Sequence, residues 1–291
     1  MSKISIRFFN DREVRAIWDE KTAKWWFSVL DIIGVLNDQD DYSKNRNYWK
    51  YLKTKLKKEG SQLVSATNQL KLVAPDGKRR LTDTLDDKGV VTLAQQLPNA
   101  RSMRFIEWFV GGEETIDSRS RTKAYTLFES KLMDAIEVGT TNGLQQIHAY
   151  LFGGLYDFAG KIRHVNIAKG GFQFAMAQHL PATLRQVEQM ADTTWEQIID
   201  KYVEMNIAHP FREGNGRATR IWLDMMLKKR LHQCIDWSQI NKYAYHEAMR
   251  ASVVNSSVLK SLLWSALTPK INDRETFMKG IDYSYYYEQE D

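Results

Sequence analysis

The residues best suited to chemistry lie in one short stretch, His209 to Arg220, which reads His-Pro-Phe-Arg-Glu-Gly-Asn-Gly-Arg-Ala-Thr-Arg. An imidazole, a carboxylate, an amide, arginines and two glycines follow one another within it. This mixture does not suit a hydrophobic core, but it suits a loop that binds a polyphosphate and a metal ion. The stretch is therefore the first candidate for a functional site.

The apolar spacing after Gly216 predicts that this loop ends at the N-terminus of a helix. Free backbone N–H groups and the helix dipole favour anions at such an end. Gly214 and Gly216 would let the backbone approach a phosphate closely, because they carry no side chain. Asn215 between them offers an amide donor.

The charged residues of the stretch have complementary uses. Arg217 and Arg220 lie three positions apart on the first helical turn, and the planar guanidinium fork suits phosphate oxygens. Glu213 is a hard oxygen ligand for a Mg²⁺ ion shared with the phosphates. His209 can take a proton near neutral pH, so it is the natural general base. The alternative is a polar interhelical loop with incidental charges, which the number of suitable positions disfavours.

The stretch also resembles a family motif. It matches the Fic motif His-x-Phe-x-(Asp/Glu)-Gly-Asn-Gly-Arg-x-x-Arg at every defined position, and the resemblance extends over roughly residues 125–291. It implies an all-helical fold and transfer of a nucleoside monophosphate, usually AMP from ATP, to a Ser, Thr or Tyr hydroxyl of a target protein. Transfer of UMP or GMP remains open.

The resemblance also implies a role for each position of the motif. His209 would deprotonate the target hydroxyl, and Phe211 would anchor the loop in the core. Glu213 would hold Mg²⁺, and the backbone around it would bind the phosphates. The ATP-binding residues implied are Gly214, Asn215, Gly216, Arg217 for the β-phosphate and Arg220 for the γ-phosphate. Related kinase-like toxins carry lysine at the position of Gly216, so the resemblance disfavours phosphate transfer.

A β-hairpin is expected shortly before this loop. Residues 166–174 read as two short strands with a turn at Gly170-Gly171. This hairpin resembles the Fic flap, which would align the backbone of the target as an added strand. The flap residues implied are Lys169, Gly170, Gly171 and Phe172. In the helical segment that begins at Leu144, His148 is expected to be a packed histidine with satisfied hydrogen bonds rather than a ligand.

The C-terminal segment carries Ser284 and Glu288, four positions apart and so on one helical face. By itself it could be an acidic, frayed terminus. It resembles, however, the C-terminal inhibitory helix of some Fic proteins, which implies that Glu288 pairs with Arg220 and excludes the γ-phosphate. Gln289 departs from the Gly or Asn usual after this glutamate. The resemblance further implies a homo-oligomer and auto-modification of a nearby tyrosine, with candidates Tyr285, Tyr286 and Tyr287.

The N-terminal part has a different pattern. Residues 4–8, 13–18 and 25–27 predict strands, the first two joined by a turn at Asn10-Asp11. Helices are expected over residues 29–36 and 100–110, and residues 90–93 could be a short strand or a helix start. Roughly residues 4–110 resemble the BRO-type N-terminal domain of phage antirepressors, on Val14-Arg15, Trp26 to Ile33 and Phe105 to Trp108. That resemblance implies DNA binding in some relatives.

Residues 42–58 combine seven basic side chains with Tyr48, Trp49 and Tyr51. Such a segment could neutralise phosphates and stack on bases. The simpler interpretation is a solvated helix with its aromatic rings turned inward. DNA is therefore a possible partner of residues 1–112.

Composition supports two parts in a chain of 291 residues with a net charge of +5. Residues 1–112 hold 20 Lys and Arg against 14 Asp and Glu, whereas the remainder holds 21 against 22. The single cysteine, Cys234, excludes an internal disulfide and is expected to be buried. No secretory signal or long apolar run is apparent, so we expect a cytoplasmic protein without a membrane partner.

The sequence therefore predicts a multidomain chain. A small α+β domain over residues 1–112 precedes an all-α Fic domain with a β-hairpin flap over residues 113–291. The predicted function is an autoinhibited protein adenylyltransferase that uses ATP and Mg²⁺ on an unidentified target. The alternative is a DNA-binding regulator whose Fic-like part binds nucleotide or mediates assembly without transfer. His209 favours the enzyme, because nucleotide binding alone needs no base.

Overall fold

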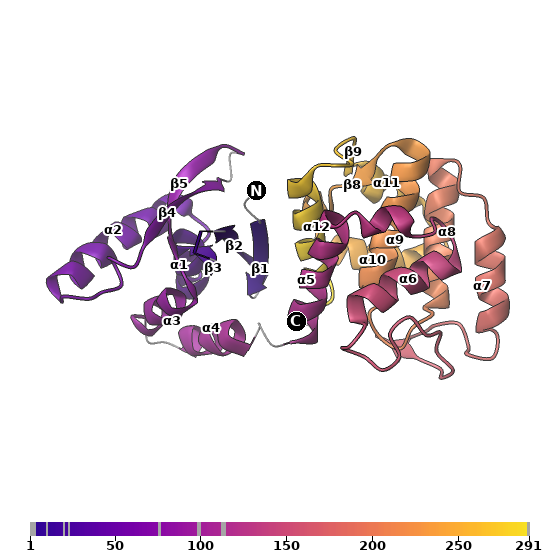
Figure 1. Cartoon of the computed structure of the whole chain (residues 1–291), viewed down its shortest axis with the longest axis horizontal. Coiled ribbons are helices and arrows are strands. Elements are labelled where there is room, and N and C mark those ends of the chain that lie inside the picture. Colours follow the sequence, from indigo (N-terminus) through magenta and orange to yellow (C-terminus); the bar gives the residue numbers. More distant parts are fainter. Residues whose placement is uncertain are drawn as a thin grey trace. The chain divides into compact units, whose positions relative to one another are not determined.

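The computed structural model describes residues 4–9, 11–19, 21–22, 24–74, 77–97, 100–111 and 115–289. The chain divides into two compact units, Met1–Thr115 and Ile116–Glu290. The domain boundary expected at 112–113 and the turn residue Asn10 lie outside the described residues. Each unit is described separately (Figure 1).

The N-terminal unit is built on a five-stranded antiparallel sheet of order β1-β2-β3-β5-β4. The three predicted strands are confirmed, and Phe27 of the third is fully buried. A second hairpin, β4 with β5, was not predicted, because its strands carry many polar and basic residues and little apolar alternation. The strands are β1 (Ile4–Phe9), β2 (Arg12–Asp19), β3 (Lys24–Ser28), β4 (Asn68–Val73) and β5 (Arg79–Leu85).

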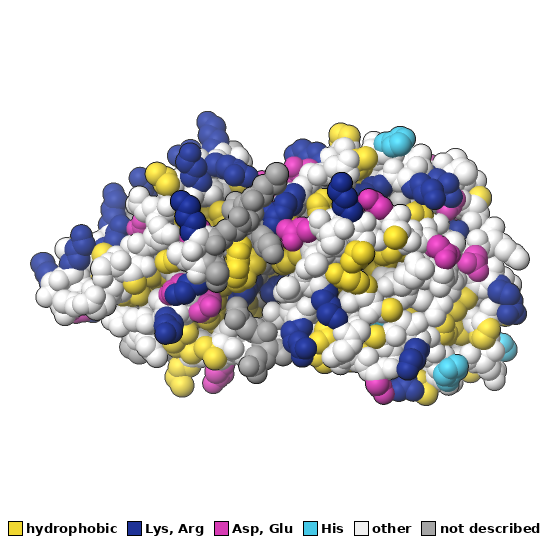
Figure 2. All heavy atoms as spheres, viewed as in Figure 1, with side chains coloured by type: hydrophobic (Ala, Val, Ile, Leu, Met, Phe, Trp, Pro, Cys, Tyr) yellow, Lys and Arg dark blue, Asp and Glu magenta, His cyan; other side chains and the backbone are white. Residues whose placement is uncertain are grey.

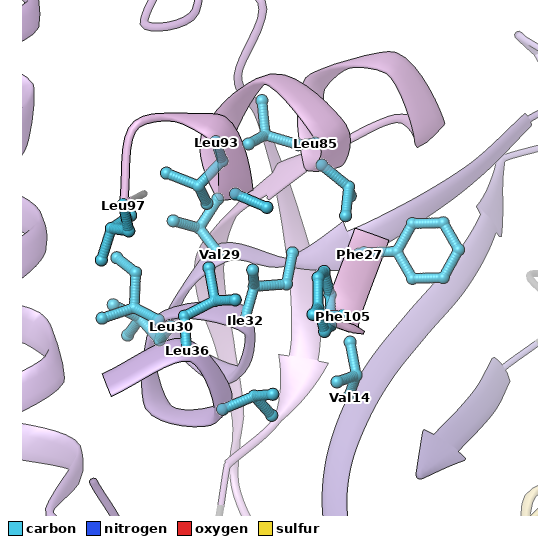
Figure 3. Packing of buried hydrophobic residues seen from close by; sticks show 14 of the residues in the cluster. Val14, Phe27, Val29, Leu30, Ile32, Leu36, Leu85, Leu93, Leu97 and Phe105 are labelled. Carbon is cyan, nitrogen blue, oxygen red and sulfur yellow. The ribbon is translucent and has the colours of Figure 1, made fainter. Parts of the chain in front are cut away.

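Four helices accompany this sheet. The Ser28 side chain caps the first of them by accepting from the Asp31 N–H, and Ile32 and Ile33 on it are fully buried. Figure 3 shows its apolar side chains meeting those of the strands and of Phe105. Residues 90–93 are helical, so the strand alternative was wrong. The helices are α1 (Val29–Asn37), α2 (Tyr42–Lys58), α3 (Asp87–Gln95) and α4 (Ala100–Gly111).

Two residues that carry the BRO-type resemblance have a structural use. The Arg15 guanidinium pairs with both carboxylate oxygens of Asp31, at 2.5 and 2.7 Å. The Asp31 carboxylate also accepts from the Arg15 backbone N–H at 3.0 Å. This ion pair joins β2 to α1, so these two side chains are engaged within the unit.

The C-terminal unit is mainly helical, and its centre is the helix that follows the His209 loop. That helix is buried over most of its length, from Asn215 to Leu227, and it packs against α6, α8 and α12. The helices of this unit are α5 (Ile116–Glu129), α6 (Thr141–Phe152), α7 (Leu180–Gln189), α8 (Trp195–Ala208), α9 (Asn215–Leu231), α10 (Lys242–Ser252), α11 (Ser257–Trp264) and α12 (Arg274–Tyr286).

The short strands of this unit form two pairs. The predicted hairpin is confirmed as β6 (Ala168–Lys169) with β7 (Phe172–Gln173), and Gly170 and Gly171 both have positive φ. A second pair, β8 (Cys234–Ile235) with β9 (Leu267–Thr268), was not predicted. Cys234 is buried, as expected. In the described part of the chain no helix is both long and apolar enough to cross a membrane.

Candidate active site

The loop from His209 to Gly214 joins the end of α8 to the start of α9. His209 is the C-terminal cap of α8 and has a left-handed backbone, with φ of 48°. Few residues other than glycine adopt this conformation. The bend ends α8 at His209 and begins the loop that leads to α9.

The His209 imidazole is held on two sides. Its ring stacks on Phe174 at a centroid distance of 3.7 Å, and its Nδ1 lies 3.2 Å from the carbonyl oxygen of Asn206. Because a carbonyl can only accept, Nδ1 carries the proton and Nε2 carries the lone pair. Burial lowers the pKa of His209 to about 4, so the ring is neutral at physiological pH. A neutral ring with a basic Nε2 can accept a proton.

Three buried side chains fix the rest of the loop. Phe211 is fully buried, and its ring stacks on His148 at 3.8 Å. The Asn215 amide donates to the Phe211 carbonyl and accepts from the Phe211 N–H, each at 2.8 Å. The Asn215 side chain thus holds the loop together, and its role toward a nucleotide stays a prediction. Its backbone N–H remains the group that could face an anion.

His148 acts in the same way, as predicted. Its Nε2 donates to the Glu213 carbonyl at 2.8 Å, and its Nδ1 accepts from the Gly160 N–H at 2.9 Å. Burial lowers the pKa of His148 to about 4, so both contacts are made by a neutral ring. His148 is a packed, satisfied histidine that supports the loop from behind.

The N-terminus of α9 is closely packed around its glycines. Gly214, at φ of 80°, caps the helix, and a Cβ there would lie 2.4 Å from the Phe152 ring. A Cβ on Gly216 would lie 2.1 Å from Oε1 of Glu288. The space above Gly216 is therefore filled by the carboxylate of Glu288, from the turn that follows α12.

Arg217 lies at this end with its side chain only 4% exposed. It donates to Glu213 at 2.8 Å and pairs with Asp117 of α5. Its Nε is buried and has no hydrogen-bond acceptor among the described residues. A buried donor without a partner is costly, so this atom points to a missing acceptor such as a phosphate oxygen.

Glu213 is largely exposed, with 54% of its side chain accessible. Its Oε1 accepts from the Gly214 N–H at 2.9 Å and from Arg217. No group of three or more His, Cys, Asp or Glu side chains within the described residues could hold a metal alone. Glu213 therefore fits a Mg²⁺ ion only if substrate oxygens supply most of its other ligands.

Arg220 is the most heavily engaged arginine of the loop and helix. Its Nε donates to the Ser284 hydroxyl at 2.7 Å, and its Nη2 donates to the Ser284 carbonyl at 2.7 Å and to Glu288 Oε1 at 2.6 Å. Burial alone would raise the pKa of Glu288, but the charges of Arg220 and Arg217 outweigh it and lower it to about 2. Glu288 lies in the turn after α12, two residues beyond its helical end, rather than within the helix as predicted.

Residues 139–227, which contain this loop, match the model of the Fic/DOC family. The chain contains a Fic/DOC domain. The matched region runs from just before α6 to within α9, so it includes the flap hairpin and all of the motif.

Curated relatives match the same part of the chain. Protein adenylyltransferase VbhT of Bartonella schoenbuchensis is 32% identical over 157 residues, which are 48% of this chain and 32% of VbhT. The probable protein adenylyltransferase Fic of Escherichia coli K12 is 24% identical over 143 residues, 45% of this chain and 71% of that protein. The match thus spans about a third of VbhT and a larger share of the Escherichia coli protein.

Solved structures of Fic proteins align with about half of the chain. The BepC protein of Bartonella tribocorum, solved with bound AMPPNP, aligns with a TM-score of 0.46 at 20% identity. The alignment covers 53% of this chain and 87% of BepC.

The flap of the Fic domain is exposed except at its aromatic residues. Phe172 contacts Phe174, which in turn stacks on His209, so the flap and the candidate base share one aromatic cluster. Lys169 Nζ lies 3.9 Å from Glu288 Oε2. The flap therefore touches both the candidate base and the carboxylate that pairs with Arg220.

The candidate tyrosines of the Fic domain are all buried. The Tyr285 hydroxyl donates to Ser120 at 3.0 Å, and the Tyr287 hydroxyl donates to the carbonyls of Trp237 and Ile240 at 2.7 and 2.9 Å. Tyr286 is only 8% exposed. In this conformation none of the three presents a free hydroxyl, so modification would require α12 to leave its site.

Sequence reasoning missed two residues of this site, Asp117 and Arg163. Asp117 pairs with Arg217 from a hundred positions earlier in the chain, and Arg163 binds the backbone of His209. Neither lies in a recognisable motif. Only tertiary packing brings them to the loop: α5 packs against α6 and α12, and Arg163 contacts the end of α8.

Proposed function

We propose that the Fic domain is an autoinhibited protein adenylyltransferase that transfers AMP from ATP to a hydroxyl of a target protein. The hydroxyl oxygen attacks the α-phosphorus, the bond between the α-phosphorus and the bridging oxygen breaks, and pyrophosphate leaves. The hydroxyl proton passes to Nε2 of His209. Relatives named protein adenylyltransferases match this region, which supports the reaction class.

The observation that carries the proposal is the state of His209. Its ring is neutral, its Nδ1 is occupied by Asn206, and its Nε2 is the atom left to accept a proton. The loop places this ring a few residues before the helix N-terminus where an anion is favoured. A general base beside a phosphate site is what attack by a hydroxyl requires.

The phosphate end of the site rests on α9. Its first N–H groups, the unpartnered Nε of Arg217 and the guanidinium of Arg220 supply donors for a triphosphate. Glu213 would hold the Mg²⁺ ion together with phosphate oxygens, and that ion would neutralise charge on the leaving group. The chain's own residues then act chiefly by positioning and by charge stabilisation.

The flap would present the target. An extended target segment paired with β6 would bring its hydroxyl toward His209, because Phe174 at the flap's base stacks on that ring. Backbone pairing selects an extended shape rather than a sequence. A Ser, Thr or Tyr hydroxyl could therefore be presented.

Autoinhibition is proposed from the Arg220 contacts. Glu288 and Ser284 occupy the guanidinium that a γ-phosphate would need, and the Glu288 carboxylate lies against Gly216. ATP could bind productively only after this carboxylate moves. Glu288 would thus inhibit the domain by competing with the γ-phosphate for the Arg220 guanidinium.

The reaction class is tested with ATP labelled at either the α- or the γ-phosphate. Glu288→Gly protein with Mg²⁺ and host lysate should transfer the α-label to protein and leave the γ-label in pyrophosphate. Transfer of the γ-label would indicate phosphorylation instead. No transfer of either label, with ATP binding intact, would favour the regulator that binds nucleotide without chemistry.

A second function is proposed for the N-terminal unit, contact with DNA phosphates through α2. Figure 2 shows Lys and Arg side chains gathered over α2 and over the β4–β5 hairpin. Two residues of α2 are engaged within the unit and do not suit contact with DNA. Lys53 forms an ion pair with Asp83 at 2.9 Å, and Trp49 is buried. Tyr51, at 65% exposed, is the aromatic residue best placed to stack on a base. The exposed basic residues on α2 are Lys44, Arg46, Lys50, Lys55, Lys57 and Lys58.

Replacing Lys50 and Lys57 by glutamine in the full chain should weaken binding to duplex DNA. Each lost phosphate contact should reduce the slope of log affinity against log salt by about 1. Lys229→Gln, an exposed lysine on α9, is the matched control and should leave the slope unchanged. Equal effects of the two changes, or no binding by the unaltered chain at low salt, would remove the DNA proposal.

A further inference from the structure

Arg163 is a buried arginine whose partners in the described structure are all backbone carbonyls. It is 2% exposed. Its Nε donates to the His209 carbonyl at 2.7 Å, and Nη2 donates to the Ala208 carbonyl at 3.0 Å. These two carbonyls end α8 and would otherwise lack intrahelical donors. Arg163 thus caps the helix that delivers His209.

The same guanidinium also binds both stems of the flap. Nη1 donates to the Val165 carbonyl at 2.7 Å, and Nη2 donates to the Ala175 carbonyl at 2.5 Å. Val165 precedes β6 and Ala175 follows β7. One side chain therefore connects the two ends of the flap to the residue proposed as the base.

The backbone of Arg163 completes this arrangement. Its N–H donates to the Pro210 carbonyl at 2.9 Å, and the Ala175 N–H donates to the Ile207 carbonyl at 3.1 Å. The segments before and after the flap are therefore joined to the chain on the two sides of His209. Burial lowers the pKa of Arg163, which agrees with a guanidinium solvated by carbonyl dipoles rather than by a carboxylate.

The geometry of the contacts needs the guanidinium fork. Its donors lie in one plane and point in several fixed directions. They can therefore bind four carbonyls, two at the end of α8 and one on each stem of the flap. A lysine ammonium at the end of a flexible stem cannot span both sets. His209 has a left-handed backbone, which is unfavourable for a residue with a side chain unless its surroundings hold it.

We propose that Arg163 is a positioning residue for the transfer reaction. It holds the His209 backbone and the flap stems in one arrangement, so that the base and the target strand are aligned together. The link to transfer rests on the proposed function, whereas the effect on His209 and on the flap does not. Arg163 touches neither reacting group and acts through the backbone alone.

The first test is an NMR titration of Arg163→Lys, with the His209 resonance assigned from its loss in His209→Ala. Loss of the Arg163 guanidinium contacts should let the His209 ring move away from Phe174. The pKa of His209 should then rise from about 4 toward the ordinary value of about 6.5. Amide hydrogen exchange in residues 166–174 should accelerate at least about tenfold. An unchanged pKa with unchanged flap exchange would overturn the proposal.

The matched control is Lys201→Met. Lys201 is another buried cation of the Fic domain that binds carbonyls, those of Glu188 and Met190, but it lies away from the loop. Its replacement should lower the melting temperature without changing the His209 pKa or the flap exchange. Equal changes in the two variants would show that Arg163 matters only for stability.

Activity supplies the last readout. In a Glu288→Gly background, Arg163→Lys should lower transfer of α-labelled AMP to lysate proteins at least about tenfold, while ATP affinity stays within about threefold. If Glu288→Gly transfers nothing, the adenylyltransferase proposal fails, and the titration and exchange still decide the role of Arg163. If Arg163→Lys does not fold, Arg163→Gln replaces it, and loss of the fold in both would overturn the positioning role.

Discussion

Replacing Glu288 by glycine is expected to raise the rate of AMP transfer by roughly 100-fold. Glu288 forms a buried ion pair with Arg220 at 2.6 Å and fills the space above Gly216. Breaking such a pair corresponds to about 3 kcal/mol or more, and each 1.4 kcal/mol is about a factor of ten in an equilibrium. The measurement is the initial rate of α-label incorporation at saturating ATP and Mg²⁺.

Replacing Glu288 by glycine should also lower the stability of the protein without nucleotide. Without Glu288, the buried guanidinium of Arg220 keeps its hydrogen bonds to Ser284 but loses its carboxylate partner, so the free protein should melt at a lower temperature. The phosphates of ATP would replace the negative charge that Arg220 has lost. ATP should therefore raise the melting temperature of Glu288→Gly more than that of the unaltered chain. Gln289→Gly is the matched control, because Gln289 follows Glu288 and its side chain is exposed. Equal rates in Glu288→Gly and the unaltered chain would refute the brake.

Acidification alone should not release this brake. The pKa of Glu288 is lowered to about 2, so its stabilising charge is present above the ordinary value near 4.5 and is lost only as pH falls through about 2. Physiological pH changes lie above that window. In the proposed mechanism, release would therefore come from movement of α12 and the turn after it, or from competition by nucleotide, and either would break the contact of Glu288 with Lys169.

Much of the site followed from the sequence, because its signals are local. The order of His209, Phe211 and Gly214 predicts a loop, a buried anchor and a helix N-terminus without knowledge of the rest of the chain. The paired glycines Gly170 and Gly171 likewise predict the hairpin turn, because glycine readily adopts positive φ. Both residues have positive φ in the structure. Ser28 before an apolar run predicts the start of α1 in the same way.

The remainder depends on tertiary packing. The pairing of Asp117 with Arg217 and the contacts of Arg163 with the His209 backbone join segments that lie far apart in the chain. The β4–β5 hairpin carries few apolar residues, so periodicity gave no signal for it. Burial of Tyr285 and its neighbours depends on the seating of α12, which spacing alone does not predict.

Replacing His209 by alanine in the Glu288→Gly background should lower AMP transfer by about 10²- to 10⁴-fold, the usual contribution of a general base. ATP affinity should stay within about twofold, because the phosphate donors lie on α9 and the loop is held by Phe211 and Asn215. Rate and binding are measured on the same protein, by label incorporation and by calorimetry. His179→Ala, which removes an exposed histidine, is the control and should change neither.

The pH profile gives His209 a signature that a structural role would not produce. Burial lowers its pKa to about 4, so the neutral, proton-accepting ring persists well below the ordinary histidine value of about 6.5. Transfer by Glu288→Gly should stay nearly constant from about pH 8 to about pH 5 and fall only as pH approaches about 4. The loss of Glu288 removes a charge that raises this pKa, so the midpoint should lie no higher than in the unaltered chain. A midpoint near 6.5 would mean that the catalytic ring is solvated, and a flat profile in His209→Ala at an undiminished rate would mean that another group takes the proton.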